Sequence, residues 1–189
     1  MSKLYIYDSS SSIDVKQAKG RFSGEKGVHT VAASSVADLQ SRLDALLGTG
    51  QTFERVLFQT HGNSGSIFFN HEAIDSVKIS TFVKYCVLFP KRTKVYFDGC
   101  NVADGKQGWA FLAAAGHALL LLGGGVTMAY TSLGTGLPGW VPLIGGHTEH
   151  LWGDLRLIDF KPGGIESERL DSDDGMNEMM RIVATTKQF

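Results

Sequence analysis

The sequence predicts an α/β fold, with a mainly parallel β-sheet and helices on both of its faces. Short apolar runs rich in β-branched and aromatic residues alternate along the chain with segments of helical periodicity. This alternation of strand and helix is typical of parallel sheets covered by helices. Because 189 residues without an internal repeat or linker fit one core, we expect a single domain over residues 1–189.

Glycine, proline and serine mark where the elements begin and end. Leucines spaced three and four apart predict an amphipathic helix over 35–48, with Ser34 or Ser35 as its cap and Gly48 at its end. Pro90 stops the second helix. The expected strands are 3–8, 28–34, 55–60, 94–99 and 125–132, the helices 35–48, 80–89 and 105–122, and a small hairpin 66–74.

Two regions lack this regularity. Residues 9–27 are rich in Ser, Gly and Lys, which favours a loop or a flap. Residues 132–189 are expected to form an elaboration around one end of the sheet, with a short strand at 155–160 and a terminal helix. The apolar stretch 109–146 could be a membrane span, but "GGG" at 123–125 divides it, so a buried helix followed by a buried strand is the better interpretation.

Composition narrows the classes of function. A formal net charge of -1 offers no basic surface for nucleic acid. Two cysteines are too few for a disulfide framework, and the N-terminus lacks the pattern of a signal peptide. We therefore expect a cytoplasmic protein, or one secreted by a route without an N-terminal signal peptide. No motif indicates a cofactor.

Two strands end on a reactive side chain beside a glycine. His61-Gly62 follows the strand 55–60, and Gly99-Cys100 follows the strand 94–99. Catalytic groups gather at the carboxyl ends of parallel strands, so neighbouring strands would bring His61 and Cys100 together. A cysteine attacks as its thiolate, and an imidazole can accept its proton. The glycines would let the backbone N–H groups of Gly62 and Cys100 approach a substrate carbonyl as an oxyanion hole.

This ordered pair of motifs resembles the caspase-like cysteine peptidases. More closely, "VYFDGCNVADGKQGWAF" is similar to the "GCNVA-G--G--F" signature of a bacterial caspase-like domain of unknown function, in which "SHG-SG" comes earlier. The resemblance covers about 56–132. It implies a three-layer sandwich and a cysteine endopeptidase acting on a protein or peptide, with Cys100 as nucleophile and His61 as acid or base.

The resemblance also implies further site residues. Gly62 and Gly99 belong to the oxyanion region, and Asp98, Thr131 and Ser132 become candidate substrate contacts by their position beside the pocket. The segment "DGCNV" departs from the Gln-Ala-Cys-Arg-Gly type of segment of the caspases proper, so their specificity for Asp does not carry over.

Other interpretations of the sequence also stay open. The chain could be a non-catalytic caspase-like module for binding or secretion, or a toxin-like one whose apolar segment engages a membrane. "GHTEHLWGD" places His147, Glu149, His150 and Asp154 close together, although not in the order of zinc peptidases. An acidic wall for a basic substrate residue could come from Glu149, Asp154 or Asp159. His117 is expected to be a core residue of the third helix.

Overall fold

The computed structural model describes residues 2–12, 27–132 and 154–171. A seven-stranded sheet has the order β10-β9-β8-β7-β3-β1-β2, and a second sheet has the order β4-β5-β6. The strands of the large sheet are β1 Lys3–Asp8, β2 Val28–Ala33, β3 Arg55–Gln59, β7 Thr93–Asp98, β8 Gly125–Tyr130, β9 Leu155–Lys161 and β10 Gly164–Asp171. The small sheet consists of β4 His61–Asn63, β5 Ser66–Phe69 and β6 Glu72–Ile74.

The large sheet is mainly parallel, as the sequence predicts. Strands β2, β1, β3, β7 and β8 run in one direction, whereas β9 and β10 are antiparallel to their neighbours. The last two strands come from the region after Ser132, so 155–171 extends the sheet at its edge. The terminal helix expected beyond residue 171, like the cluster at His147 to His150, lies outside the described residues.

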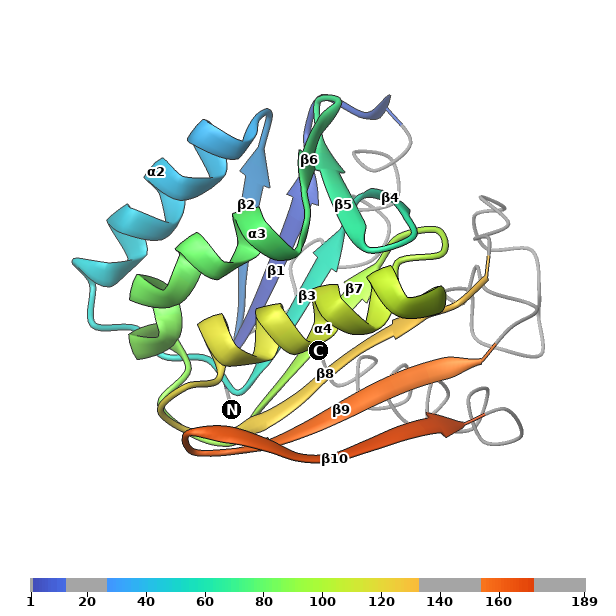
Figure 1. The fold of residues 1–189 in the computed structure, drawn as a ribbon. Coiled ribbons are helices and arrows are strands. Elements are labelled where there is room, and N and C mark those ends of the chain that lie inside the picture. The colour runs from blue at the N-terminus through green and yellow to red at the C-terminus, as the bar shows by residue number, and fades with distance from the viewer. Residues whose placement is uncertain (1, 13–26, 133–153, 172–189) are drawn as a thin grey trace.

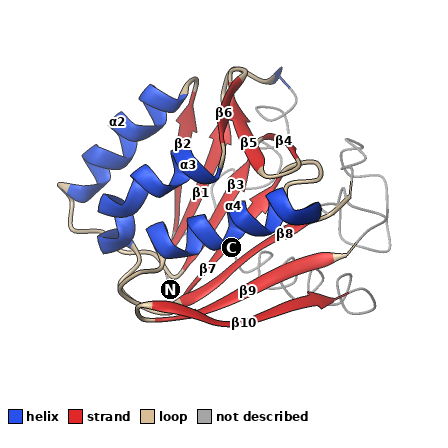
Figure 2. Ribbon diagram, in the orientation of Figure 1, coloured by secondary structure: helices blue, strands red, loops and turns tan. Residues whose placement is uncertain are grey.

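The described helices lie in one layer in front of the sheet (Figures 1 and 2). They are α2 Val36–Leu47, α3 Ser76–Ser80, the 3-10 helix η1 Thr81–Leu88 and α4 Gly105–Leu119. The connections that contain them all run the same way across the sheet, which places them on one face by the right-handed rule. The connection from β1 to β2 runs the other way and falls on 13–26, outside the described residues. A helix on the second face therefore stays a prediction.

The main core lies between the sheet and these helices. Phe58 of β3 stacks on Phe97 of β7 at 5.0 Å between ring centroids, and Phe97 meets Phe111 of α4 edge-on at 4.9 Å. All three rings are at most 1% exposed. Each buried aromatic side chain contributes about 1.5–3 kcal/mol, so this stack fixes β3 and β7 as neighbours beneath α4.

Alternate residues of the strands form a second apolar cluster on the other face of the sheet. Tyr5, Leu57, Tyr96, Met128 and Leu157 are opposite one another on successive strands from β1 to β9. All are buried. The sheet is thus apolar on both faces, which agrees with the near-continuous hydrophobic runs of its strands.

Two expectations about helices need correction. The helix expected at 80–89 begins earlier, as α3 at Ser76, because the Asp75 carboxylate accepts hydrogen bonds from the backbone N–H groups of Val77 and Lys78. It then continues as η1. His117 is exposed on α4, where its ring edge packs on Phe160, rather than being a core residue. Among the described residues, no helix has the length and apolar character needed to cross a membrane.

Candidate functional site

The carboxyl ends of β3 and β7 are held together directly. Gln59 is opposite Asp98 in the parallel register, and the N–H of Thr60 donates to the carbonyl of Asp98 at 3.3 Å. His61 and Cys100 each stand two residues beyond this pair. Since adjacent strands lie about 5 Å apart, the backbones of the two residues leave the sheet as neighbours.

The two glycines are packed against each other. A Cβ on Gly99 would lie 3.2 Å from both N and Cα of Gly62, and a Cβ on Gly62 would lie 2.5 Å from Cγ2 of Val102 and 3.0 Å from the carbonyl oxygen of Cys100. A side chain at Gly62 does not fit unless Val102 shifts, and one at Gly99 would be in tight contact with its neighbours. The close approach of the two loops therefore favours glycine at both positions, and it brings His61-Gly62 beside Gly99-Cys100.

Backbone hydrogen bonds hold the Cys100 loop on both sides. Asn101 N–H donates to Ser132 O at 2.8 Å, and Ala103 N–H donates to Tyr130 O at 3.0 Å, which ties the loop to the end of β8. Gly65 N–H donates to Val102 O at 3.1 Å from the small sheet. Asn101 has φ of 55°, an uncommon left-handed conformation for a residue other than glycine. Cys100 is partly buried at this turn.

His61 is the first residue of the small sheet, in β4. It pairs with Phe68 of β5, and its side chain is exposed. Its Nε2 lies 3.3 Å from Oγ of Ser11, within hydrogen-bonding distance. The contact with Ser11 engages Nε2 and leaves Nδ1, the second ring nitrogen, to face another partner. In this way Ser11 affects the orientation of the imidazole.

A cavity of about 590 Å³ opens beside His61. Residues Asp8, Ser10, Ser11 and Ser12 line it from the end of β1, His61, Gly62 and Asn63 from β4, and Phe68, Asn70 and His71 from the β5–β6 hairpin. The sheet order reverses direction between β1 and β3, because β2 lies on one side of this pair and β7 and β8 on the other. Ligands bind at such a reversal in open α/β sheets, so this is a candidate binding site.

The carboxylate of Asp8 connects two walls of this cavity through hydrogen bonds. Its Oδ1 accepts from the backbone N–H of Ser10 at 2.8 Å and from Oγ of Ser10 at 2.7 Å. Its Oδ2 accepts from the backbone N–H of Asn70 at 3.0 Å. Asn70 and His71 form the hairpin turn with φ of 48° and 68°. One carboxylate therefore connects the end of β1 to a hairpin more than sixty residues later in the chain.

The three candidate substrate contacts lie on the Cys100 side, outside the cavity lining. Asp98 is 6% exposed, and Tyr96 donates its hydroxyl to Asp98 Oδ1 at 3.4 Å. Thr131 Oγ1 accepts from the N–H of Asp154 at 3.0 Å, and Ser132 holds Asn101 through its carbonyl. These residues support the loop that carries Cys100.

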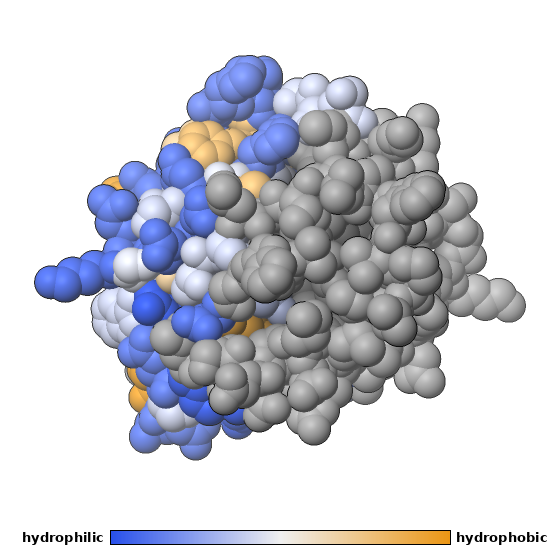
Figure 3. Space-filling view, turned by 90° about the vertical axis from the view of Figure 1, so that its right-hand side faces the viewer, coloured by the Kyte–Doolittle hydropathy of each residue, from blue (hydrophilic) through white to orange (hydrophobic). Residues whose placement is uncertain are grey.

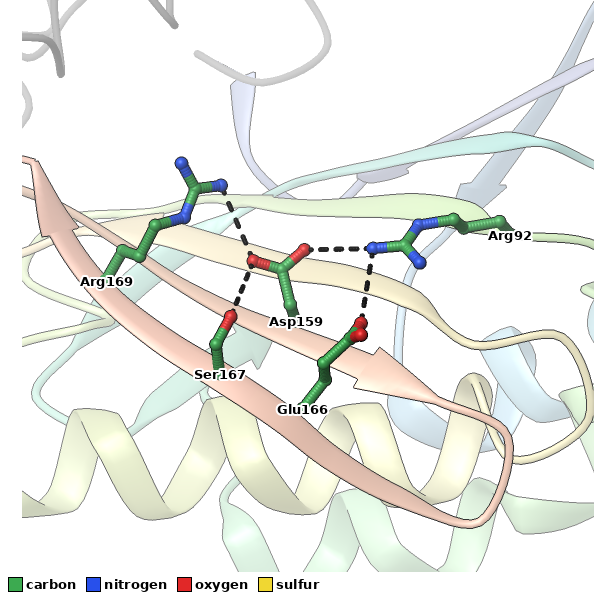
Figure 4. Close-up of polar contacts among 5 residues, drawn as sticks. All are labelled: Arg92, Asp159, Glu166, Ser167 and Arg169. Atoms are coloured by element: carbon green, nitrogen blue, oxygen red, sulfur yellow. Dashed lines mark hydrogen bonds and ion pairs between the residues drawn. The ribbon is translucent and has the colours of Figure 1, made fainter.

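Asp159 does not belong to an acidic wall at this site. It pairs with Val126 near the start of β8, at the opposite end of the sheet from Cys100. Its carboxylate lies between the guanidinium groups of Arg92 and Arg169, at 3.3 and 3.5 Å (Figure 4). Within the described ranges there is no group of three or more His, Cys, Asp or Glu side chains suited to a metal ion.

Sequence reasoning missed part of the cavity. Asp8, Asn70 and His71 were given no role, although Asp8 also stands at the carboxyl end of a strand and is followed by four serines. Applying the same strand-end rule to β1 would have found Asp8. The hairpin residues carry no comparable signal, because only the folding of β5 and β6 over β1 brings them to the cavity.

On the side of the molecule shown in Figure 3, the described residues are mainly hydrophilic, with a few hydrophobic residues among them. No protein-family model matches the chain, and no curated protein matches it as a relative.

Proposed function

We propose that the protein is a cysteine hydrolase of the caspase-like kind, which cleaves peptide or other acyl bonds. Cys100 is the nucleophile and His61 is the acid and base. The observation that carries this proposal is the contact between the two strand ends, where Gly62 packs against Gly99 and places the loops of His61 and Cys100 side by side.

The reaction that this arrangement supports has two steps. His61 accepts the thiol proton, the Cys100 sulfur attacks the carbonyl carbon, and His61 returns the proton to the leaving amine as the acyl bond breaks. Water, deprotonated by His61, then hydrolyses the thioester and releases the carboxylic acid and the thiol. The backbone N–H groups of Gly62 and Cys100 are the proposed donors to the oxyanion.

The test is the alkylation rate of Cys100 by iodoacetamide between about pH 5 and 9, in a Cys86→Ala background that leaves one thiol. We expect rapid alkylation of Cys100, because the imidazole of His61 accepts the thiol proton. His61→Ala should slow this alkylation. His117→Ala removes an exposed histidine from α4 and is the matched control, so it should leave the profile unchanged.

A peptide-library screen with wild type and Cys100→Ala then identifies the cleaved bonds. A Cys100 thiol that is unreactive near neutral pH, or indifferent to His61, would contradict the proposal. The glycines would then serve only the packing of two loops, and the chain would be a non-catalytic binding module with the same sheet.

A further inference from the structure

The described residues that line the cavity beside His61 carry an unbalanced charge. Among them, Asp8 is the only acidic residue, and none is lysine or arginine. Asp8 is 3% exposed. A carboxylate removed from water in this way produces a strong local field, because the surroundings screen it poorly.

Neutral groups hold the Asp8 carboxylate without cancelling its charge. Among the described residues, its hydrogen-bond donors are the backbone and hydroxyl of Ser10 and the backbone of Asn70. A carboxylate has about four acceptor positions, and these bonds occupy three. One acceptor position of the carboxylate therefore has no donor among the described residues, and a cationic donor from a ligand suits it best because charge-assisted hydrogen bonds are the stronger kind.

The rest of the wall fits a long side chain with a polar end. Phe68 supplies an apolar surface for a methylene stem, while Ser12 and Asn63 offer oxygen atoms nearer the exposed rim. The volume of about 590 Å³ exceeds that of any amino-acid side chain. His61 lines the same cavity, so a side chain bound there would lie beside the proposed acid and base.

We propose that this cavity binds the positively charged side chain of an arginine or lysine in a peptide. The position of that residue next to the cleaved bond rests on the proposed function, whereas binding of the cation rests on the charge of Asp8 and does not require the proposed chemistry of Cys100.

The probe is Nα-acetyl-arginine amide, and its control is Nα-acetyl-citrulline amide, which has nearly the same shape without the charge. Each is titrated into the full chain carrying Cys100→Ala, and the ring proton signals of His61 and His71 are followed by NMR. His61→Ala and His71→Ala assign these signals. We expect the arginine probe to shift both signals and to bind at least about tenfold more tightly than the citrulline probe.

Two variants remove the charge preference by different routes. Asp8→Asn removes the charge, and Ser12→Lys adds an opposing charge at the rim without touching the contacts of Asp8. Both should lose the discrimination between the probes. Asp104→Asn is the matched control, since its exposed side chain makes no capping hydrogen bond at the start of α4 and lies outside the cavity.

Equal binding of the two probes would overturn the inference, as would unchanged discrimination in a folded Ser12→Lys protein. Selective binding of the arginine probe supports the pocket even when Cys100 proves unreactive, so the two proposals fail separately. A reactive Cys100–His61 pair that cleaves peptides without preference for basic residues would overturn the assignment of this cavity to the substrate while leaving the hydrolase intact.

Discussion

Gly62 and Gly99 pack against each other where β3 and β7 end. The close approach of their backbones leaves no space for a Cβ on Gly62 unless Val102 shifts, and only a tight fit for one on Gly99. The same approach aligns the loops of His61 and Cys100. The sequence could therefore predict that both glycines lie at strand ends. It could not predict that they contact each other, because this contact depends on the register of β3 with β7.

Gly62→Ala should destabilise the fold. Its Cβ would meet Val102 Cγ2 at 2.5 Å, and overpacking of this kind costs about 1–3 kcal/mol. Val102 supplies the clashing atom. The double variant Gly62→Ala/Val102→Ala should therefore lose less free energy of unfolding than the sum of the losses in the two single variants. Urea unfolding of the four proteins in this cycle measures the coupling. Strictly additive effects would show that Val102 does not limit the space at Gly62.

The two cysteines should differ in reactivity. Burial raises the pKa of the Cys86 thiol, which is 7% exposed on η1, so less of it is thiolate at a given pH. Cys100 lies partly exposed at a turn. Limited alkylation of the native protein at neutral pH, followed by peptide mass mapping, should label Cys100 first. Labelling of both at equal rates in urea is the control, and preferential labelling of native Cys86 would contradict the expectation.

Whole elements were predicted where local pattern is sufficient. Helix α2 begins at the expected cap, since Ser35 Oγ accepts from the N–H of Asp38 at 3.1 Å. Strand β10 was not predicted, because Gly164–Asp171 is mostly polar and is stabilised by pairing with β9 rather than by its own pattern. Strand β4 was missed for the same reason, since a three-residue strand exists only through its pairing with β5.

Asp38 should make the stability of α2 depend on pH. A hydrogen bond from the backbone N–H of Ser34, together with the guanidinium of Arg42, lowers the pKa of Asp38 below its ordinary value. A lowered folded-state pKa adds stability above the unfolded pKa, and this contribution is lost as the pH falls through the folded pKa. Asp38→Asn should therefore be less stable than wild type at pH 7.

At a pH well below the lowered folded-state pKa of Asp38, the difference in stability between Asp38→Asn and wild type should disappear, because the wild-type carboxyl is then protonated. Thermal unfolding followed by circular dichroism at both pH values measures it. The same measurement on Asp75→Asn, a variant of the capping residue of α3, shows whether low pH changes the stability contributed by another helix cap. A gap that persists at low pH would mean that Asp38 acts through its shape rather than its charge.

At the scale of the whole molecule, the two ends of the sheet have different roles. The carboxyl ends of β1, β3 and β7 carry the cavity, His61 and Cys100, as the rule for parallel strands predicts. The amino ends carry the Asp159 ion pairs, which the sequence could not distinguish from an acidic substrate wall. That distinction requires the antiparallel direction of β9, which returns Asp159 to the far end of the sheet.

Asp159→Ala should therefore affect stability without affecting the site. Its carboxylate is 16% exposed, but Arg92 and Arg169 are 64% and 54% exposed, and pairs of this kind contribute about 0–1 kcal/mol each. We expect a loss of about 1 kcal/mol in urea unfolding, which 0.5 M salt should reduce by screening. The alkylation profile of Cys100 and the binding of the arginine probe should both match wild type. Weaker binding of the arginine probe by Asp159→Ala would mean that the charge of Asp159 acts on the cavity across the sheet, and that the two ends of the sheet are not independent.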